Sequence, residues 1–313
     1  MAIPLASETK FGALTRLPTP ALARQTIELL DRLEYDSIWV GDHLAFTQPI
    51  LDPFVQLAHA AAYSDRITVA TGVYLLPMRH PALAAKQAAS LDHLCEGRFI
   101  FGVGVGGEFP REWELAGVDT KERGVRLDES IEVMRKLWQG EPVSHEGKFF
   151  PFPEVHMQPA AYQQGGPPIW CGGRSDAALR RAGRLGDGYL SYVVTPGMFT
   201  DALVKIADAA DAVGREVTEY GTGHLLFCCM AETYEKAWDR ATELLSERYA
   251  MDFRRAAKRY CALGPAEEVA AKIKEFHEAG VRHFVFDFLG SQEERIAGLE
   301  QFSAEVMPRL KDL

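Results

Sequence analysis

Eight short apolar runs alternate along this chain with segments that show the apolar spacing of amphipathic helices. Runs with so little polar alternation are typical of parallel strands that are buried on both faces. The expected strands are 11–14, 37–40, 67–73, 99–103, 168–171, 189–192, 225–230 and 283–289. Because helical patterns connect them, neighbouring strands are expected to pair in parallel. The count of eight in 313 residues, with no composition break near the middle, predicts a single α/β domain over 1–313, a closed (β/α)8 TIM barrel. An open doubly wound sheet is the alternative.

One segment breaks the alternation. Residues 139–166, after the fourth helical segment at 121–138, are rich in proline, glycine and aromatic residues. We expect an inserted excursion or hairpin here that covers part of the barrel. Its aromatic run 149–152 suggests an apolar or cyclic organic ligand, and packing of the same rings on the barrel is the alternative.

Charge and cysteine content argue against several classes of protein. The net charge is −10 and there is no basic cluster, so nucleic acid and anionic membranes are unlikely partners. No run approaches the roughly eighteen apolar residues of a membrane span, and the N-terminus lacks the pattern of a signal peptide. Five cysteines without a CxxC pair fit reduced thiols in a cytoplasmic protein.

In a barrel of this kind the active site lies at the carboxyl ends of the strands. The fourth expected strand ends in a run of glycines with charged residues behind it: Gly102, Gly104, Gly106, Gly107, Glu108, Arg111 and Glu112. Bare backbone lets a ligand approach closely. The run is not a dinucleotide fingerprint, because no helix begins on its last glycine. A glycine-rich turn with solvated charges is the alternative.

Asp42 and His43 follow the second expected strand. A histidine at the mouth of a barrel can donate or accept a proton near neutral pH. Glu108 would form an acid/base pair with His43 if the folded barrel brought them together. The alternative is a histidine bonded to nearby backbone. The remaining histidines show no metal-ligand spacing, so we expect no metal site.

The fifth expected strand ends in Gly172, Gly173, Arg174 and Ser175, just before a helix. Backbone N–H groups at a helix start, together with a guanidinium, bind phosphate well. An ordinary turn capped by the serine is the alternative. Arg79 is a further candidate for a phosphate or an anionic substrate, with a surface ion pair at least as plausible.

Taken together, these segments resemble the bacterial luciferase-like family of flavin- and deazaflavin-dependent barrel oxidoreductases (monooxygenases). The resemblance rests on SIWVGDHLAF at 37–46, on 71–109 with its FGVGVGGEF end, on ERGVRLDESIEVMRKLW at 122–138, on PPIWCGGRSDAALRRAGRLGDGYL at 167–190, and on 264–286. It runs through nearly the whole chain in order. It is specific for the family and says little about the substrate.

The resemblance implies a flavin-type cofactor at the barrel mouth, either FMN or the 8-hydroxy-5-deazaflavin coenzyme of actinobacteria and methanogens. The ring would pack on a bulge at Gly72 and Val73, a place where the family often has a non-prolyl cis peptide. The phosphate would lie at 172–175 and His43 near the reactive face of the ring. In the deazaflavin sugar-phosphate dehydrogenases a glutamate shortly after the fourth strand acts as the acid, and Glu108 stands at a comparable place. The other expected cofactor contacts are Asp42, Gly104 and Arg111.

The activity expected from the resemblance is that of an FMN-dependent monooxygenase, which uses oxygen and reduced flavin from a partner reductase on a small organic substrate. A deazaflavin-dependent reductase or dehydrogenase is the alternative, since no residue excludes either cofactor. A non-catalytic flavin-binding protein is the third reading. We also expect a homodimer formed through 56–62 and 82–94, because these helices carry many small and apolar residues and soluble oligomers usually adopt two-fold symmetry.

Overall fold

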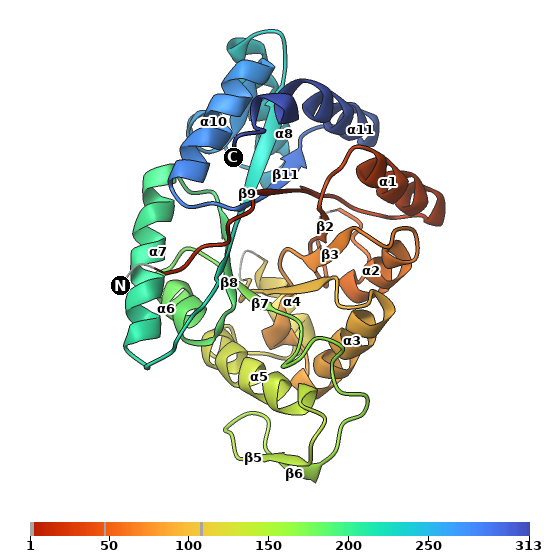
Figure 1. The fold of residues 1–313 in the computed structure, drawn as a ribbon, viewed down its shortest axis with the longest axis vertical. Helices are drawn as coiled ribbons and strands as arrows, with labels where there is room; N and C mark the ends of the chain where they lie inside the picture. Colours follow the sequence, from red (N-terminus) through yellow and green to blue (C-terminus); the bar gives the residue numbers. More distant parts are fainter. Residues whose placement is uncertain (1–2, 47, 107–108) are drawn as a thin grey trace.

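The computed structural model describes residues 3–46, 48–106 and 109–313. Within these residues a closed barrel of eight parallel strands occupies the centre of the molecule (Figure 1). The strands are β1 (Lys10–Leu14), β2 (Ser37–Val40), β3 (Thr68–Thr71), β4 (Phe99–Val103), β7 (Ile169–Gly172), β8 (Gly188–Tyr192), β9 (Gly221–Met230) and β11 (His283–Phe288). They pair in that order, and the β1–β11 pair closes the ring. The predicted barrel is therefore confirmed, and the open sheet is wrong.

Helices surround the barrel (Figure 1). The long ones are α1 (Pro20–Arg32), α2 (Pro53–Ala61), α3 (Pro81–Leu94), α5 (Arg123–Trp138), α6 (Asp176–Leu185), α7 (Pro196–Asp211), α8 (Tyr234–Tyr249), α10 (Ala266–Glu278) and α11 (Gln292–Gln301). Several begin with proline directly after a capping residue. Thr19, Asp52 and Thr195 each accept a hydrogen bond from a backbone N–H of the first turn. This arrangement satisfies donors that a helix leaves unpaired at its start.

The sequence patterns missed the short helix α4 (Pro110–Ala116) and the strand β10 (Ala262–Gly264), which pairs with β9 beside the barrel. Each has seven residues or fewer, which is too short for a hydrophobic period to show. The helical pattern that the sequence indicates over 234–260, with a break, is divided between α8 and α9 (Arg254–Tyr260), and Ala250 between them adopts a left-handed conformation.

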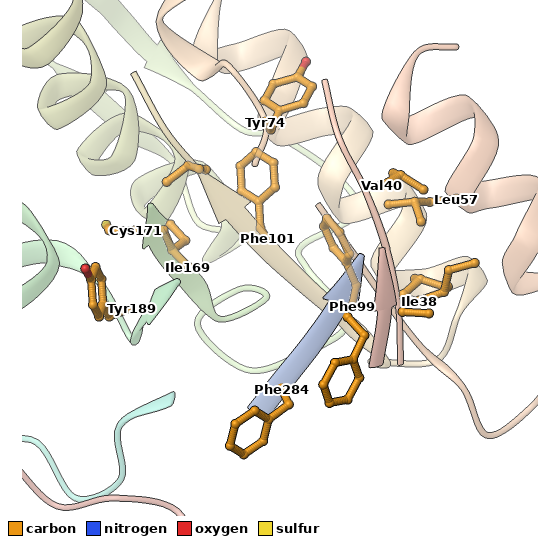
Figure 2. Packing of buried hydrophobic residues seen from close by; sticks show 14 of the residues in the cluster. Ile38, Val40, Leu57, Tyr74, Phe99, Phe101, Ile169, Cys171, Tyr189 and Phe284 are labelled. Atoms are coloured by element: carbon orange, nitrogen blue, oxygen red, sulfur yellow. The ribbon is translucent and has the colours of Figure 1, made fainter. Parts of the chain in front are cut away.

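Alternate residues of the strands pack on the two sides of the barrel wall. Those that point outward pack under the helices in the larger cluster, and those that point inward fill the barrel. Figure 2 shows part of the outer cluster, with Ile38 and Val40 of β2 and Leu57 of α2 on one side and Ile169 and Cys171 of β7 on the other. Because both sides of each strand are buried, the sequences of the strands are continuous apolar runs.

Two indole rings fill the centre of the barrel. The ring centroids of Trp39 and Trp170 lie 5.6 Å apart, and both side chains are buried. The indole Nε1 of Trp39 donates to Ser37 Oγ at 2.8 Å, and the same hydroxyl lies 2.6 Å from His283 Nε2. The polar groups of Ser37, Trp39 and His283 thus satisfy one another inside the barrel.

Two buried histidines should make the stability of the barrel depend on pH. Burial lowers the pKa of His224 and of His283 from 6.5 to about 3. Between these values the unfolded histidine binds a proton and the folded one does not, so acid stabilises the unfolded chain. We expect each histidine to lower the free energy of unfolding by about 2 kcal/mol between pH 7 and pH 5.

Urea unfolding at the two pH values measures this effect. His224→Gln should remove one histidine's share of the pH dependence. His59→Gln, at an exposed position, is the matched control and should leave the dependence unchanged. If the free energy of unfolding of His224→Gln changed between the two pH values as much as that of the unmodified protein, a role of His224 in the pH dependence would be contradicted.

The segment 139–166 forms an antiparallel pair outside the barrel, β5 (Val143–His145) with β6 (Phe152–Val155) (Figure 1). The carboxylate of Glu129 on α5 anchors it by accepting hydrogen bonds from the backbone N–H groups of Phe149 and Phe150. The rings of both phenylalanines lie near the guanidinium of Arg126. No residue of this segment lines the cavity at the barrel mouth. The expectation that its aromatics meet a ligand is therefore wrong, and they pack on the scaffold.

No helix in the described part of the chain is long and apolar enough to cross a membrane. All five cysteines are free and buried.

Candidate active site

A cavity of about 620 Å³ opens at the carboxyl ends of the barrel strands, within the size range of small-molecule and cofactor sites. All eight barrel strands contribute to its wall, most of them through their last residues or the loops that follow, and β9 through Leu225 and Phe227 in its middle. This is where the ligands of such barrels bind. Most of the residues selected from the sequence meet here.

The floor of the cavity is bare and apolar at Val73. The peptide bond between Gly72 and Val73 is cis, as the resemblance implied. Gly104 and Gly172 press against the two methyl groups of Val73, since a Cβ at either position would come within 2.5 Å and 2.8 Å of them. A side chain at Gly104 or Gly172 would therefore displace Val73. The sequence explains the flat floor by placing glycine at the ends of β4 and β7.

The turn 172–175 lies at one side of the cavity. Gly173 has a φ of +126°, and Ser175 caps α6 by accepting a hydrogen bond from Ala178 N–H at 3.3 Å. Arg174 is exposed, and its Nη1 contacts the carbonyl of Val193 at 3.4 Å. Within the described residues this guanidinium forms no ion pair, so its charge is available to a ligand beside the start of α6.

His43, after β2, lines another part of the wall and is held by a buried carboxylate. Its Nδ1 lies 3.0 Å from Glu112 Oε2. The other oxygen of Glu112 accepts hydrogen bonds from the backbone N–H groups of Leu44 and Ala45 at 2.6 and 2.9 Å. Because a carboxylate accepts hydrogen bonds, Nδ1 of His43 carries a proton. This leaves Nε2 as the ring nitrogen that can exchange a proton with a ligand.

Two aromatic rings complete the setting of His43. Phe46 stacks on the imidazole with ring centroids 4.2 Å apart, and Phe109 meets it edge-on at 5.4 Å. The ring is therefore held both by a hydrogen bond and by packing, which leaves it one orientation. Such fixing is what a proton-transfer group requires.

Asp42 lines the cavity, but its carboxylate is already paired with a cation. Its two oxygens lie 2.6 and 2.8 Å from the guanidinium of Arg79, and Leu75 N–H donates to it at 2.8 Å. Burial raises the pKa of Asp42, while Arg79 acts in the opposite direction. The side chain is only 1% exposed. In this structure Asp42 and Arg79 form a buried ion pair that fixes the loops after β2 and β3, and Arg79 does not line the cavity.

Of the two remaining residues selected from the sequence, Arg111 alone is described by the structure. Arg111 is exposed on α4 and is not among the residues that line the wall. Glu108 lies outside the described residues. Within the part of the chain that is described, the carboxylate beside His43 is that of Glu112, four positions further on.

A second charged group occupies the wall at β1 and β11. Asp287, at the end of β11, lies 2.7 Å from Arg248 Nη1 and 3.0 Å from Arg295 Nη1. Arg16, just after β1, lines the cavity beside them. Asp287 lies in the expected strand 283–289, and the sequence patterns missed the three arginines around it.

The profile of the luciferase-like monooxygenase family matches residues 4–283. The chain belongs to this family. Membership confirms the resemblance that the sequence motifs suggested, and it makes this luciferase-like protein an oxidoreductase.

Three relatives illustrate the range of the luciferase-like family around this chain. An F420-dependent glucose-6-phosphate dehydrogenase of Nakamurella multipartita is 28% identical over 312 residues, which is 89% of either chain. A 4-hydroxyprotoasukamycin monooxygenase of Streptomyces nodosus subsp. asukaensis is 33% identical over 221 residues, or 68% of this chain and 59% of the relative. The crystal structure of the monooxygenase RslO1 of Streptomyces bottropensis has a TM-score of 0.82 at 27% identity, with 96% of this chain and 99% of that one covered.

The luciferase-like site differs from the sequence prediction mainly at Glu112. This glutamate stands in the same charged stretch as Glu108 but belongs to α4, which sequence patterns did not show. The local signal for Glu112 is that an acidic residue is favoured in the first turn of a helix, and this helix starts with Pro110.

Proposed function

We propose that this protein is an FMN-dependent monooxygenase, which uses oxygen and reduced flavin on a small organic substrate at the barrel mouth. The observation that carries the proposal is the bare apolar floor at Val73 beside the exposed turn 172–175. A flat ring system fits the first, and a phosphate fits the second. The 33% identical relative and the 27% identical structure, both named as monooxygenases, support it.

In this proposal the cofactor supplies the redox chemistry, and the residues of the cavity bind and orient it. A bound flavin would supply the electrons for the reaction with oxygen. Gly104, Val73 and Gly172 would lie beneath its ring and keep water from that side. Gly173, Arg174 and Ser175 would hold the phosphate through backbone N–H groups and a guanidinium. Each of these roles follows from the shape and charge of the wall.

His43 is the proton-transfer group in this proposal. Glu112 keeps the proton on Nδ1 and fixes the ring, so that Nε2 exchanges a proton with an oxygen of the substrate. Glu112 acts only through His43 and is therefore a positioning residue. A non-catalytic storage protein would have no use for a histidine oriented in this way.

Titration of the purified protein with FMN, riboflavin and the deazaflavin coenzyme F420 tests the cofactor directly, by absorbance and fluorescence. We expect FMN to bind and the loaded protein to consume oxygen when a flavin reductase supplies reduced FMN. Absence of binding of either cofactor at high micromolar concentration would overturn the proposal.

A deazaflavin-dependent dehydrogenase is the second candidate. It is favoured by the relative from Nakamurella multipartita, which matches 89% of either chain. In that reaction His43, held by Glu112, would take the hydroxyl proton of an alcohol, and a bound deazaflavin would accept the hydride from its carbon. Binding of F420 without FMN, and reduction of F420 by an alcohol without oxygen uptake, would decide for this candidate.

Arg174→Ala should weaken the binding of FMN more than it lowers stability. Loss of a charge-assisted phosphate contact costs about 1.5–3 kcal/mol, because the phosphate then lacks its cation. The measurement is the Kd of the variant for FMN and for riboflavin, which has no phosphate. An equal loss for both ligands would contradict a phosphate role for Arg174.

We also infer a homodimer, from exposed apolar side chains on α2 and α3. Val55 is 65% exposed and Leu83 is 69% exposed. Light scattering at tens of micromolar should show a dimer that Leu83→Asp weakens. Val204→Asp on α7, at a site 57% exposed, is the matched control and should not change the mass. A monomer in the unmodified protein would rule the inference out.

The partner and the compartment complete the proposal. A separate flavin reductase would supply the reduced FMN. The free, buried state of all five cysteines supports a reducing compartment such as the cytoplasm.

A further inference from the structure

The wall of the cavity at β1 and β11 holds three guanidinium groups and one carboxylate. Arg248 comes from the last turn of α8 and Arg295 from α11, and both pair with the buried Asp287. Arg16 follows β1. Residues far apart in the chain are thus gathered at one place because β1 and β11 are neighbours in the ring.

Positive charge predominates in this cluster. Burial would raise the pKa of Asp287, but the attraction of Arg248 and Arg295 outweighs it and holds this pKa below 3.8. The carboxylate is therefore ionised at neutral pH. Burial, and then repulsion from Arg295 and Arg248, lowers the pKa of Arg16, yet a guanidinium remains protonated in proteins. Three cations face one anion, so the cluster carries two excess positive charges.

Arg16 is the least engaged member of the cluster. In the described part of the chain it forms no ion pair or hydrogen bond, whereas Arg248 and Arg295 are fixed by Asp287. The scaffold needs only the paired arginines to attach α8 and α11 to β11. Among the described residues, this half-buried guanidinium at the wall of the cavity has no anion to compensate it.

The cluster lies across the cavity from the turn 172–175. In the ring of strands, β1 is separated from β7 by β2, β3 and β4 on one side and by β11, β9 and β8 on the other. Apolar side chains of β8 and β9, Leu190, Leu225 and Phe227, line the wall near it. The other carboxylates of the cavity, Asp42 and Glu112, are engaged by Arg79 and His43 at β2.

We propose that Arg16, Arg248 and Arg295 form a second anion subsite, which binds a carboxylate or phosphate group of the substrate. The substrate is then an organic anion with an apolar part, held with its charged end at β1 and β11. This inference rests on the proposed function, because it assigns the turn 172–175 to the phosphate of the cofactor and leaves the arginine cluster for the substrate. Guanidinium forks suit both anions, because they bind two oxygens at once.

Binding of inorganic phosphate and of acetate by calorimetry, at fixed ionic strength, tests the subsite without any cofactor. The background is the Arg174→Gln protein, in which the other candidate phosphate site is weakened. Adding Arg16→Gln should weaken anion binding about 10- to 100-fold. Arg16→Lys keeps the charge and should retain most of the affinity. Tighter binding of phosphate than of acetate would assign the subsite to phosphate esters, and the reverse to carboxylic acids.

Asp287→Asn should change the affinity for anions in the direction opposite to Arg16→Gln. It removes the only negative charge of the cluster, so anions should bind more tightly to this variant if its melting curve stays cooperative. Equal anion binding with and without Arg16→Gln would overturn the subsite. Loss of binding in both Arg16→Gln and Asp287→Asn would also overturn it, since the cluster would then act as a structural unit.

The same variants separate this inference from the proposed function. Arg16→Gln should bind FMN as the unmodified protein does. Failure of the unmodified protein to bind FMN would refute the proposed cofactor, and the phosphate and acetate titrations would still decide the subsite.

Discussion

Replacing His43 by alanine is expected to lower turnover by about 10²–10⁴-fold, while the melting temperature and the affinity for FMN change little. The reason is that Nε2 is the free nitrogen of a ring whose other nitrogen is bound to Glu112 at 3.0 Å. Steady-state kinetics, with cofactor binding and thermal unfolding measured alongside, would show whether the loss is confined to the chemical step.

Glu112→Gln separates orientation from proton transfer. The amide can still accept the hydrogen bonds of Leu44 and Ala45, but it no longer favours a proton on Nδ1 of His43. We expect a shifted pH profile of turnover and a smaller loss than in His43→Ala. Unchanged turnover in His43→Ala would transfer the proton-transfer role to another group, and Glu108 would be the first to test. His224 and His283 cannot produce such a profile between pH 5 and 8, because their pKa values are about 3.

Replacing Asp42 by alanine is expected to lower the free energy of unfolding by about 3–5 kcal/mol, because Arg79 would keep its buried charge without a partner. Urea unfolding of the variant measures the loss. Asp31→Ala is the matched control, since the Asp31–Arg66 pair is about half exposed and should contribute no more than about 1 kcal/mol.

The same variant decides whether Asp42 has a second role. A sequence-based expectation placed Asp42 in contact with the cofactor. If Asp42→Ala kept its stability and lost affinity for FMN, that contact would be favoured over the structural role described here.

The sequence was sufficient for the barrel because the strands are buried on both faces. Runs such as 37–40 and 99–103 contain no polar alternation, and their bounds agree with β2 and β4. The glycines at 104 and 172 and the turn at 172–175 were also identified, because residues at strand ends meet wherever a barrel closes. The position of these residues follows from topology alone.

The partners of the site residues could not be predicted in this way. Glu112 pairs with His43 across 69 positions, and Arg248 pairs with Asp287 across 39. The two residues of each pair are too far apart in the sequence for a spacing pattern to connect them. In addition, α4 is too short to show a helical hydrophobic period. The aromatic run 149–152 led to a wrong prediction of ligand contact. Aromatic side chains indicate that a segment is buried, but the sequence does not show whether a ligand or a helix covers them.

The two indoles at the centre of the barrel have a kinetic consequence. Trp39 lies beneath Gly72, since a Cβ on this glycine would come 3.3 Å from the indole, and Trp170 lies beside Trp39. If the cofactor of the proposed function rested on Val73 with the substrate above it, the cofactor would have to bind first and leave last. Excess substrate would then inhibit turnover, which steady-state kinetics at rising substrate concentration would reveal.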